Sequence, residues 1–217
     1  AMHRLPVIFA IDRAGVTGPD GPSHHGVYDM ALLSKVPGMR VLAPSSAQEL
    51  QQMLLDALQL VDAGPVAIRY PRGSARQVDE HEIGSGLRAN RLRSGDGAVC
   101  VLAVGKMVEA ALKSADRLAE HGRVVEVWDV RSCAPLDDEM IAAAATHRAV
   151  ITVEDGVRDG GIGAAIADRI GAISPEVPVD VLGLPTQFIP HGEAHHILAR
   201  FGLDADGITA RVRSLLD

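Results

Sequence analysis

The sequence predicts an α/β protein built around two mostly parallel sheets, the first partial and the second complete. Short apolar runs of strand length alternate with longer segments of helical periodicity, an order typical of parallel sheets. A polar, glycine-bearing stretch at 74–97 interrupts this order, which then restarts. The chain has 217 residues, 47% of them hydrophobic, and this is enough to bury two small cores.

The first sheet is expected to contain strands at 6–11, near 41–44 and at 66–70. The strand at 6–11 is apolar like a buried strand and begins almost at the first residue, with no cap or leader, as a fragment would. Ser46 and Glu49 predict a capping box at the start of a helix over 46–60, in which the Glu side chain reaches back to the cap.

The second domain is expected to continue the alternation to the end of the chain. We place the first domain at 1–78, a linker at 79–97 and the second domain at 98–217. Within the second domain, strands are predicted at 98–104, 124–130, 149–153 and 177–182, and helices at 108–122, 137–147, after 160–163, at 191–201 and at 205–216.

Composition excludes several classes of protein. The net charge of -7 is unsuited to binding nucleic acid, which needs clustered Lys and Arg. No apolar run approaches the roughly 18 residues that cross a bilayer, and the first residues lack the apolar stretch of a signal peptide. Two cysteines that do not form a CxxC pair indicate a reducing compartment, so we expect a cytoplasmic protein.

Charged side chains follow two strands predicted for the first sheet, at the edge where open α/β sheets bind ligands. Arg13, Asp20 and His24 lie in a Gly- and Pro-rich loop after the first strand, and Arg72 follows a later strand. Paired guanidinium groups suit a phosphate dianion, and a His beside a carboxylate can exchange protons near neutral pH. The alternative is a rigid turn with a surface His, an Asp12–Arg13 ion pair and a solvated Arg72.

Other signals favour structural roles. The glycines at 160–163 lack the GxGxxG spacing and the lysine of a phosphate-binding loop, so close packing of helix and strand explains them better. His191 and His195 are spaced one helical turn apart, but no third ligand is evident, and we predict no metal-binding residue. Arg69, inside its strand, is expected to face away from Arg72.

Two groups of motifs resemble one family. The segment 5–26, with its DRAG and GPDGPSHHG strings, and the YPRG at 70–73 resemble the pyrimidine-binding domain of 1-deoxy-D-xylulose-5-phosphate synthases. The segments 150–155, 160–163, 183–185 and 188–190 resemble that family's transketolase-type carboxy-terminal domain. The DGPSH core is similar to a transketolase motif, and its combination with DRAG and YPRG singles out the synthase.

The resemblance implies a thiamine-diphosphate-dependent transferase that joins pyruvate to D-glyceraldehyde 3-phosphate with loss of carbon dioxide. It implies that Arg13 and Arg72 bind the phosphate of the aldehyde. Asp20 and His24 then lie beside the thiamine adduct as catalytic residues, with His24 exchanging protons with substrate oxygens. The family further implies a homodimer in the bacterial cytosol that supplies isoprenoid precursors, thiamine and pyridoxal.

The sequence departs from the family at the cofactor. The family holds Mg2+ with a Gly-Asp-Gly motif followed downstream by Asn, whereas the only Asn here, Asn90, precedes Gly95–Gly97. We therefore expect 95–97 to be a turn. The glutamate that activates the aminopyrimidine ring belongs to the missing amino-terminal part of the enzyme, as does the diphosphate-binding domain. We expect thiamine diphosphate and Mg2+ to be held mainly there, and the chain alone to be inactive.

Two alternatives stay open. The chain is also compatible with the corresponding part of a transketolase or of a 2-oxoacid dehydrogenase beta subunit, although DRAG and YPRG argue against both. A non-catalytic assembly module of the same fold is the other alternative, because fold alone does not establish chemistry.

Overall fold

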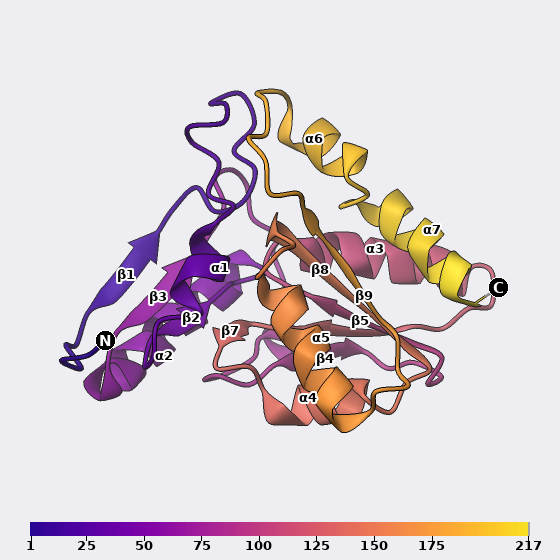
Figure 1. Ribbon diagram of the computed structural model, residues 1–217, viewed down its shortest axis with the longest axis horizontal. Helices are drawn as coiled ribbons and strands as arrows, with labels where there is room; N and C mark the ends of the chain where they lie inside the picture. The colour runs from indigo at the N-terminus through magenta and orange to yellow at the C-terminus, as the bar shows by residue number, and fades with distance from the viewer. Residues whose placement is uncertain (217) are drawn as a thin grey trace.

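The computed structural model describes residues 1–216 and contains two sheets whose strands run mostly parallel (Figure 1). The first sheet has the strand order β1-β3-β2-β7 and the second has the order β4-β6-β5-β8-β9. In each sheet one edge strand is antiparallel to its neighbour, β7 in the first and β4 in the second. The predicted α/β class is therefore confirmed. No helix among the described residues is long and apolar enough to cross a membrane.

Seven of the strands lie near predicted positions, with different ends, whereas β4 and β7 were not predicted. They are β1 (Ile8–Ile11), β2 (Arg40–Leu42), β3 (Val66–Arg69), β4 (Asn90–Arg93), β5 (Val99–Ala103), β6 (Glu126–Asp129), β7 (Ser132–Ala134), β8 (Ala149–Val157) and β9 (Val179–Leu184). The helices are α1 (Asp29–Leu33), α2 (Ala47–Leu60), α3 (Met107–Ala119), α4 (Asp138–Ala144), α5 (Ile162–Ile173), α6 (Ala194–Arg200) and α7 (Ala205–Leu216).

Strand β1 is an exposed edge, so the prediction of a buried strand at 6–11 was wrong. It pairs with β3 on one side only. Phe9 is 45% exposed and Leu5 is 55% exposed, because no described element covers the outer edge of the sheet. Apolar composition predicted a strand correctly, but it could not distinguish an interior strand from an uncovered edge.

Helix α2 begins at the predicted cap, but only half of the capping box forms. The Ser46 hydroxyl accepts a hydrogen bond from the amide of Glu49 at 3.0 Å. The Glu49 carboxylate does not return to the cap and instead accepts from the amide of Gly84 and from Nε of Arg131. A buried guanidinium is a stronger partner for a carboxylate than a backbone amide, which explains the difference.

The second sheet is covered on both faces. Side chains alternate along β5, so that Val99 and Val101 pack with α3, α6 and α7 on one face, while Cys100 and Leu102 pack with α4 and α5 on the other. The sheet begins earlier than predicted: residues 79–97, expected to be a linker, contain β4, which pairs with β6. Its sequence is short and rich in arginine, and gave no apolar signal.

Candidate functional site

The loop that carries three of the predicted site residues is tied at its base. The amide of Gly15 donates to the carbonyl of Gly26 at 2.8 Å, and the amide of Gly26 donates back at 2.9 Å. The amide of Ala14 donates to the carbonyl of Tyr70, at the end of β3. This bond places the loop beside the segment that follows Tyr70, which carries Arg72.

Arg13, Arg72 and Asp20 meet at one oxygen atom. Nη1 of Arg13 lies 2.7 Å from Oδ2 of Asp20, and Nη1 of Arg72 lies 2.6 Å from the same oxygen. The hydrogen bond from Arg72 is the main cause that lowers the pKa of Asp20. Both arginine side chains remain about half exposed, at 42% and 56%. Two guanidinium groups from separate strand ends therefore converge on one oxyanion.

The two neighbouring histidines of the loop differ in their surroundings. His24 is exposed, and its Nδ1 lies 3.0 Å from the hydroxyl of Ser23. Nδ1 of His25 accepts a hydrogen bond from the amide of Thr17 at 3.1 Å, across the loop. His25 thus stabilises the loop, whereas the imidazole of His24 faces solvent and is free to meet a ligand.

A buried ion network lies under the loop and joins the two domains. Nη1 of Arg69 lies 2.7 Å from Oδ1 of Asp155, and Nε of Arg69 lies 3.0 Å from Asp29. Lys106 lies 3.3 Å from the second oxygen of Asp155. Burial opposes ionisation of Asp155, but Arg69 and Lys106 outweigh it and lower its pKa. A Cβ at Gly15 would lie 1.8 Å from Oδ2 of Asp155, so this network is in direct contact with the base of the loop.

This network was not predicted from the sequence. Arg69 was expected only to face away from Arg72, and it does so, reaching the other domain instead. An arginine inside an apolar strand was a usable signal, because a buried guanidinium requires a carboxylate partner. Nothing local indicated which carboxylate that would be.

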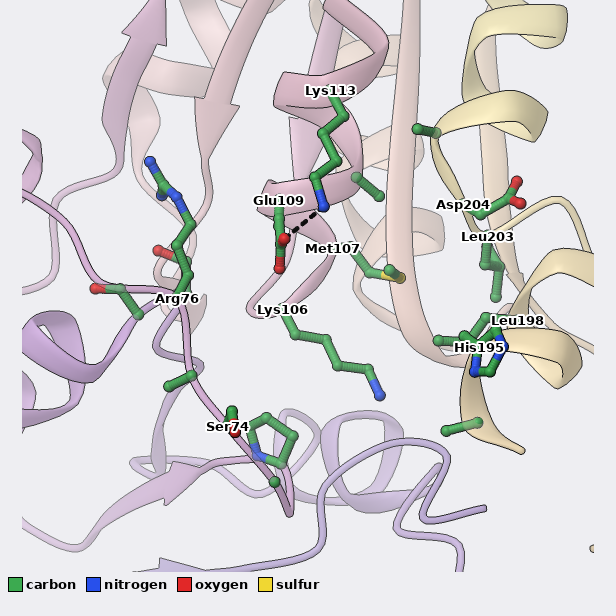
Figure 2. Close-up of a pocket in the computed structure, with 18 of the residues that line it drawn as sticks. Ser74, Arg76, Lys106, Met107, Glu109, Lys113, His195, Leu198, Leu203 and Asp204 are labelled. Atoms are coloured by element: carbon green, nitrogen blue, oxygen red, sulfur yellow. Dashed lines mark hydrogen bonds and ion pairs between the residues drawn. The ribbon is translucent and has the colours of Figure 1, made fainter. Parts of the chain in front are cut away.

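A cavity of about 730 Å³ opens beside Arg72, between the two domains (Figure 2). The segment after β3 and the start of α2 line one side of the cavity, and α3, α6 and the first turn of α7 line the other. Lys106 extends into this space between Ser74 and His195. The remaining cations of the lining have carboxylate partners of their own: Arg76 with Glu82, Lys113 with Glu109 and Arg117 with Asp206.

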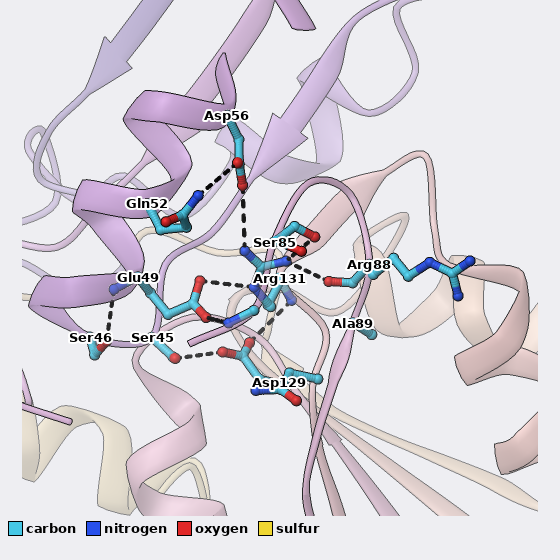
Figure 3. A network of polar contacts seen from close by, with 12 residues as sticks. Ser45, Ser46, Glu49, Gln52, Asp56, Ser85, Arg88, Ala89, Asp129 and Arg131 are labelled. Atoms are coloured by element: carbon cyan, nitrogen blue, oxygen red, sulfur yellow. Dashed lines mark hydrogen bonds and ion pairs between the residues drawn. The ribbon is translucent and has the colours of Figure 1, made fainter. Parts of the chain in front are cut away.

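Both domains also contact one buried arginine behind this cavity (Figure 3). Arg131 is 0% exposed, and its Nε donates to Glu49 of α2 at 2.8 Å. Its Nη1 donates to three carbonyl groups, those of Ser85, Gly86 and Arg88. Arg131 leads into β7, which pairs with β2 of the first sheet although it follows β6 of the second. The network therefore fixes the interface that shapes the cavity.

Asp129 gives this interface a dependence on pH. Burial, with the charge of Glu49 second, raises the pKa of Asp129 from 3.8 to about 7. A carboxyl group whose pKa is raised by folding binds more protons in the folded state, so its contribution to stability falls as the pH rises from about 4 to about 7.

We therefore expect Asp129→Asn to become more stable relative to the unaltered chain as the pH rises through this window. The asparagine side chain can still accept a hydrogen bond from the backbone amide of Arg131 and form one with the hydroxyl of Ser45. Over the whole window, the free energy of unfolding of the variant should rise relative to that of the unaltered chain. The rise should be on the order of 1 kcal/mol for each unit that separates the folded and unfolded pKa values of Asp129. Urea unfolding of both chains at about pH 5 and about pH 8 measures it. A difference that stays constant with pH would show that Asp129 does not titrate in this window.

The described residues do not fit the magnesium and diphosphate of a thiamine cofactor. Oδ1 of Asp96 accepts from the amide of Ala98 at 2.9 Å, and Gly97 has a φ of +86°, so 95–97 form the expected turn into β5. The side-chain amide of Asn90 donates to the carbonyl of Glu82. Glu49 is paired with Arg131 and is not available to a pyrimidine ring.

The weaker signals behave as structural features. The carboxylate of Glu154 accepts from the amides of Ile162 and Gly163, so it occupies the amino terminus of α5 in place of a ligand. Helix α6 begins at Ala194, after His191, which removes the helical spacing between His191 and His195. The structural interpretation of these residues is therefore the better one.

Two family models account for most of the chain. The model of the transketolase pyrimidine-binding domain matches residues 1–77, and the model of the transketolase C-terminal domain matches residues 87–208. The second match alone spans more than half of the chain. This chain therefore belongs to the transketolase family.

Among curated proteins, the chain is similar to a particular group of enzymes within this family. The chain is 42% identical over 98% of its length to the 1-deoxy-D-xylulose-5-phosphate synthase of Chlorobium luteolum, and 43% identical over its full length to that of Syntrophotalea carbinolica. It covers 34% of each of these relatives, about a third of their length. The expected resemblance to the carboxy-terminal part of the synthases is confirmed.

A solved structure has a similar fold. It is described as the inactive β4 tetramer of a split-gene transketolase, and it is 29% identical with a TM-score of 0.85. The match covers 97% of this chain and 67% of that one. The arrangement of the two domains is thus shared with a transketolase.

Proposed function

We propose that this chain is the part of a 1-deoxy-D-xylulose-5-phosphate synthase that binds the phosphate of D-glyceraldehyde 3-phosphate. The observation that supports this most strongly is the convergence of Arg13 and Arg72 on one carboxylate oxygen. An arginine pair of this kind binds a phosphate dianion through parallel N–H···O bonds. The adjoining cavity then receives the rest of the substrate.

Asp20 has two roles in this proposal. Without substrate its carboxylate satisfies both guanidinium groups, and a phosphate dianion, with more oxygens and more charge, displaces it. The released carboxylate then lies beside His24 in the same loop. The exposed imidazole of His24 exchanges protons with the hydroxyl and carbonyl oxygens of the substrates, pyruvate and the aldehyde.

The cofactor is held mainly by another part of the enzyme. Thiamine diphosphate supplies the carbanion chemistry, while this chain positions the aldehyde and moves protons. The uncovered edge of β1, and separately the exposed Leu55 and Leu58 of α2, are features of the first domain suited to docking of that part. The complete enzyme is a homodimer of the bacterial cytosol that uses Mg2+ and supplies isoprenoid precursors, thiamine and pyridoxal.

The proposal is tested by comparing the isolated chain with the complete enzyme. With thiamine diphosphate, Mg2+, pyruvate and D-glyceraldehyde 3-phosphate, the isolated chain should form no 1-deoxy-D-xylulose 5-phosphate. Joined to the amino-terminal part of the synthase, in one polypeptide or as a complex, it should form product. Chromatography of the sugar phosphates with mass detection measures both.

Each contrary result selects a different alternative. Turnover by the isolated chain would overturn the division of the active site between two parts. A complete enzyme that transfers ketol groups from sugar phosphates but does not decarboxylate pyruvate would be a transketolase. A complete assembly with neither activity would be a non-catalytic module.

A further inference from the structure

We propose that Cys100, Glu126 and His147 bind a divalent transition-metal ion of the zinc type. The three side chains lie at the amino-terminal edge of the second sheet, away from the cavity, which adjoins the opposite end of β5. They contribute one sulfur, one oxygen and one nitrogen atom, all within 4.8 Å of one another. No residue of this group belongs to the proposed phosphate site, so the two proposals stand or fail separately.

The fold brings the group together from three segments. Cys100 of β5 and Glu126 of β6 are partners in the parallel register, so their side chains lie on the same face of the sheet. His147 comes from the turn between α4 and β8. The exposed fractions of the three residues are 0%, 6% and 7%, so the site excludes most solvent.

A hydrogen bond of His147 at Nδ1 leaves its Nε2 atom directed at Glu126. Nδ1 lies 3.1 Å from the carbonyl of Ala143, which can only accept, so Nδ1 carries the hydrogen. Nε2 then presents a lone pair 3.7 Å from Oε1 of Glu126. A lone pair facing a carboxylate is repulsive unless a positive charge lies between them. A metal ion bound between Nε2 and Oε1 supplies that charge, while Arg91 lies 3.6 Å from the other carboxylate oxygen, Oε2.

The surrounding contacts match those of a metal site. Histidines that bind metals usually donate their other N–H to a carbonyl or a carboxylate, as His147 does, and carboxylate ligands are themselves hydrogen-bonded. Here Nε1 of Trp128 donates to Oε1 of Glu126 at 2.7 Å. These outer contacts hold both ligands in place before any ion binds.

The ligand set selects the metal. Thiolate and imidazole ligands favour zinc over magnesium or calcium, which prefer oxygen. With bonds of about 2.0 to 2.3 Å, tetrahedral ligands lie roughly 3.3 to 3.8 Å apart. The 3.7 Å between Nε2 of His147 and Oε1 of Glu126 lies just above the roughly 3.3 to 3.6 Å expected of a nitrogen and an oxygen ligand, so a small movement of either side chain closes the site. The thiolate and the carboxylate balance the charge of the ion, and Cys100 loses one proton to solvent when it binds. Water takes the fourth position.

Cobalt is the probe, because Co2+ reports a thiolate ligand by its absorption. The chain is treated with a chelator, dialysed and titrated with Co2+, and Zn2+ is then added to displace it. We expect one Co2+ per chain, with the visible bands of a tetrahedral site and a near-ultraviolet sulfur-to-metal band. Elemental analysis gives the same stoichiometry for Zn2+.

The chain offers a matched control, since Cys133 is also free and buried. Cys100→Ser should abolish the sulfur-to-metal band, and Cys133→Ser should leave it unchanged. Glu126→Gln, which retains an acceptor for Trp128, should weaken binding by at least the roughly 100-fold that loss of a supporting residue can cost. A missing band in the unaltered folded chain would overturn the proposal, and the three side chains would then form a buried polar cluster that binds no metal. A band lost only in Cys133→Ser would also overturn it.

Discussion

Replacing Arg131 with Met is expected to lower the free energy of unfolding by about 3 to 5 kcal/mol, the usual cost of removing one partner from a buried ion pair. The side chain is 0% exposed, and its Nε is 2.8 Å from a Glu49 that is 1% exposed. Met fills similar space but leaves that carboxylate without its cation. The carbonyls of Ser85, Gly86 and Arg88 also lose their donor.

Urea unfolding followed by the fluorescence of Trp128, the single tryptophan, measures this loss. Arg88→Met is the matched control, because Arg88 pairs with Glu139 at the surface, where both side chains are more than half exposed. An exposed pair contributes little to stability, so Arg88→Met should unfold at nearly the same urea concentration as the unaltered chain. Similar losses in the two variants would mean that the Arg131 network does not hold the domains together.

Arg72→Lys is expected to raise the KM for D-glyceraldehyde 3-phosphate at least tenfold in the complete enzyme, about 1.4 kcal/mol or more. Lysine keeps the charge but cannot offer the planar, two-pronged contact that a guanidinium makes with phosphate. The KM for pyruvate should change much less, because pyruvate carries no phosphate. Steady-state kinetics with each substrate varied in turn measures both constants.

Arg76→Lys is the control for this substitution. Arg76 lines the same wall of the cavity, but its partner is Glu82 rather than Asp20. It should leave the KM for the aldehyde within about twofold of the unaltered enzyme, since a paired cation adds little. If Arg72→Lys raised the two KM values equally, Arg72 would have a structural role.

Local sequence was sufficient to predict the parts of the site that depend on strand ends. An apolar strand followed by a polar, glycine-rich loop predicted that Arg13 and Asp20 lie at one edge of the sheet, and a later strand predicted the same for Arg72. The DRAG, GPDGPSHHG and YPRG motifs indicated the family. Neither indicated that Asp20 itself pairs with both arginines, because that depends on how the loop folds back.

The parts that could not be predicted depend on contacts between distant segments. Asp155 meets Arg69 across 86 positions, and Arg131 meets Glu49 across 82. Cys100 and Glu126 become neighbours through strand register, which their sequence does not reveal. Strand β4 was missed for a similar reason: its backbone pairs with β6, while two of its four side chains are arginines and only one is apolar.

Binding of a phosphate group by Arg13 and Arg72 is measured most directly by titrating the 217-residue chain and following its arginine Nε–Hε signals by NMR. Glycerol 3-phosphate is the ligand and glycerol the control. We expect saturable shifts of Arg13 and Arg72 with the phosphate ester, and none with glycerol. Shifts confined to the cavity cations Arg76 and Arg117, with Arg13 and Arg72 unmoved, would contradict it.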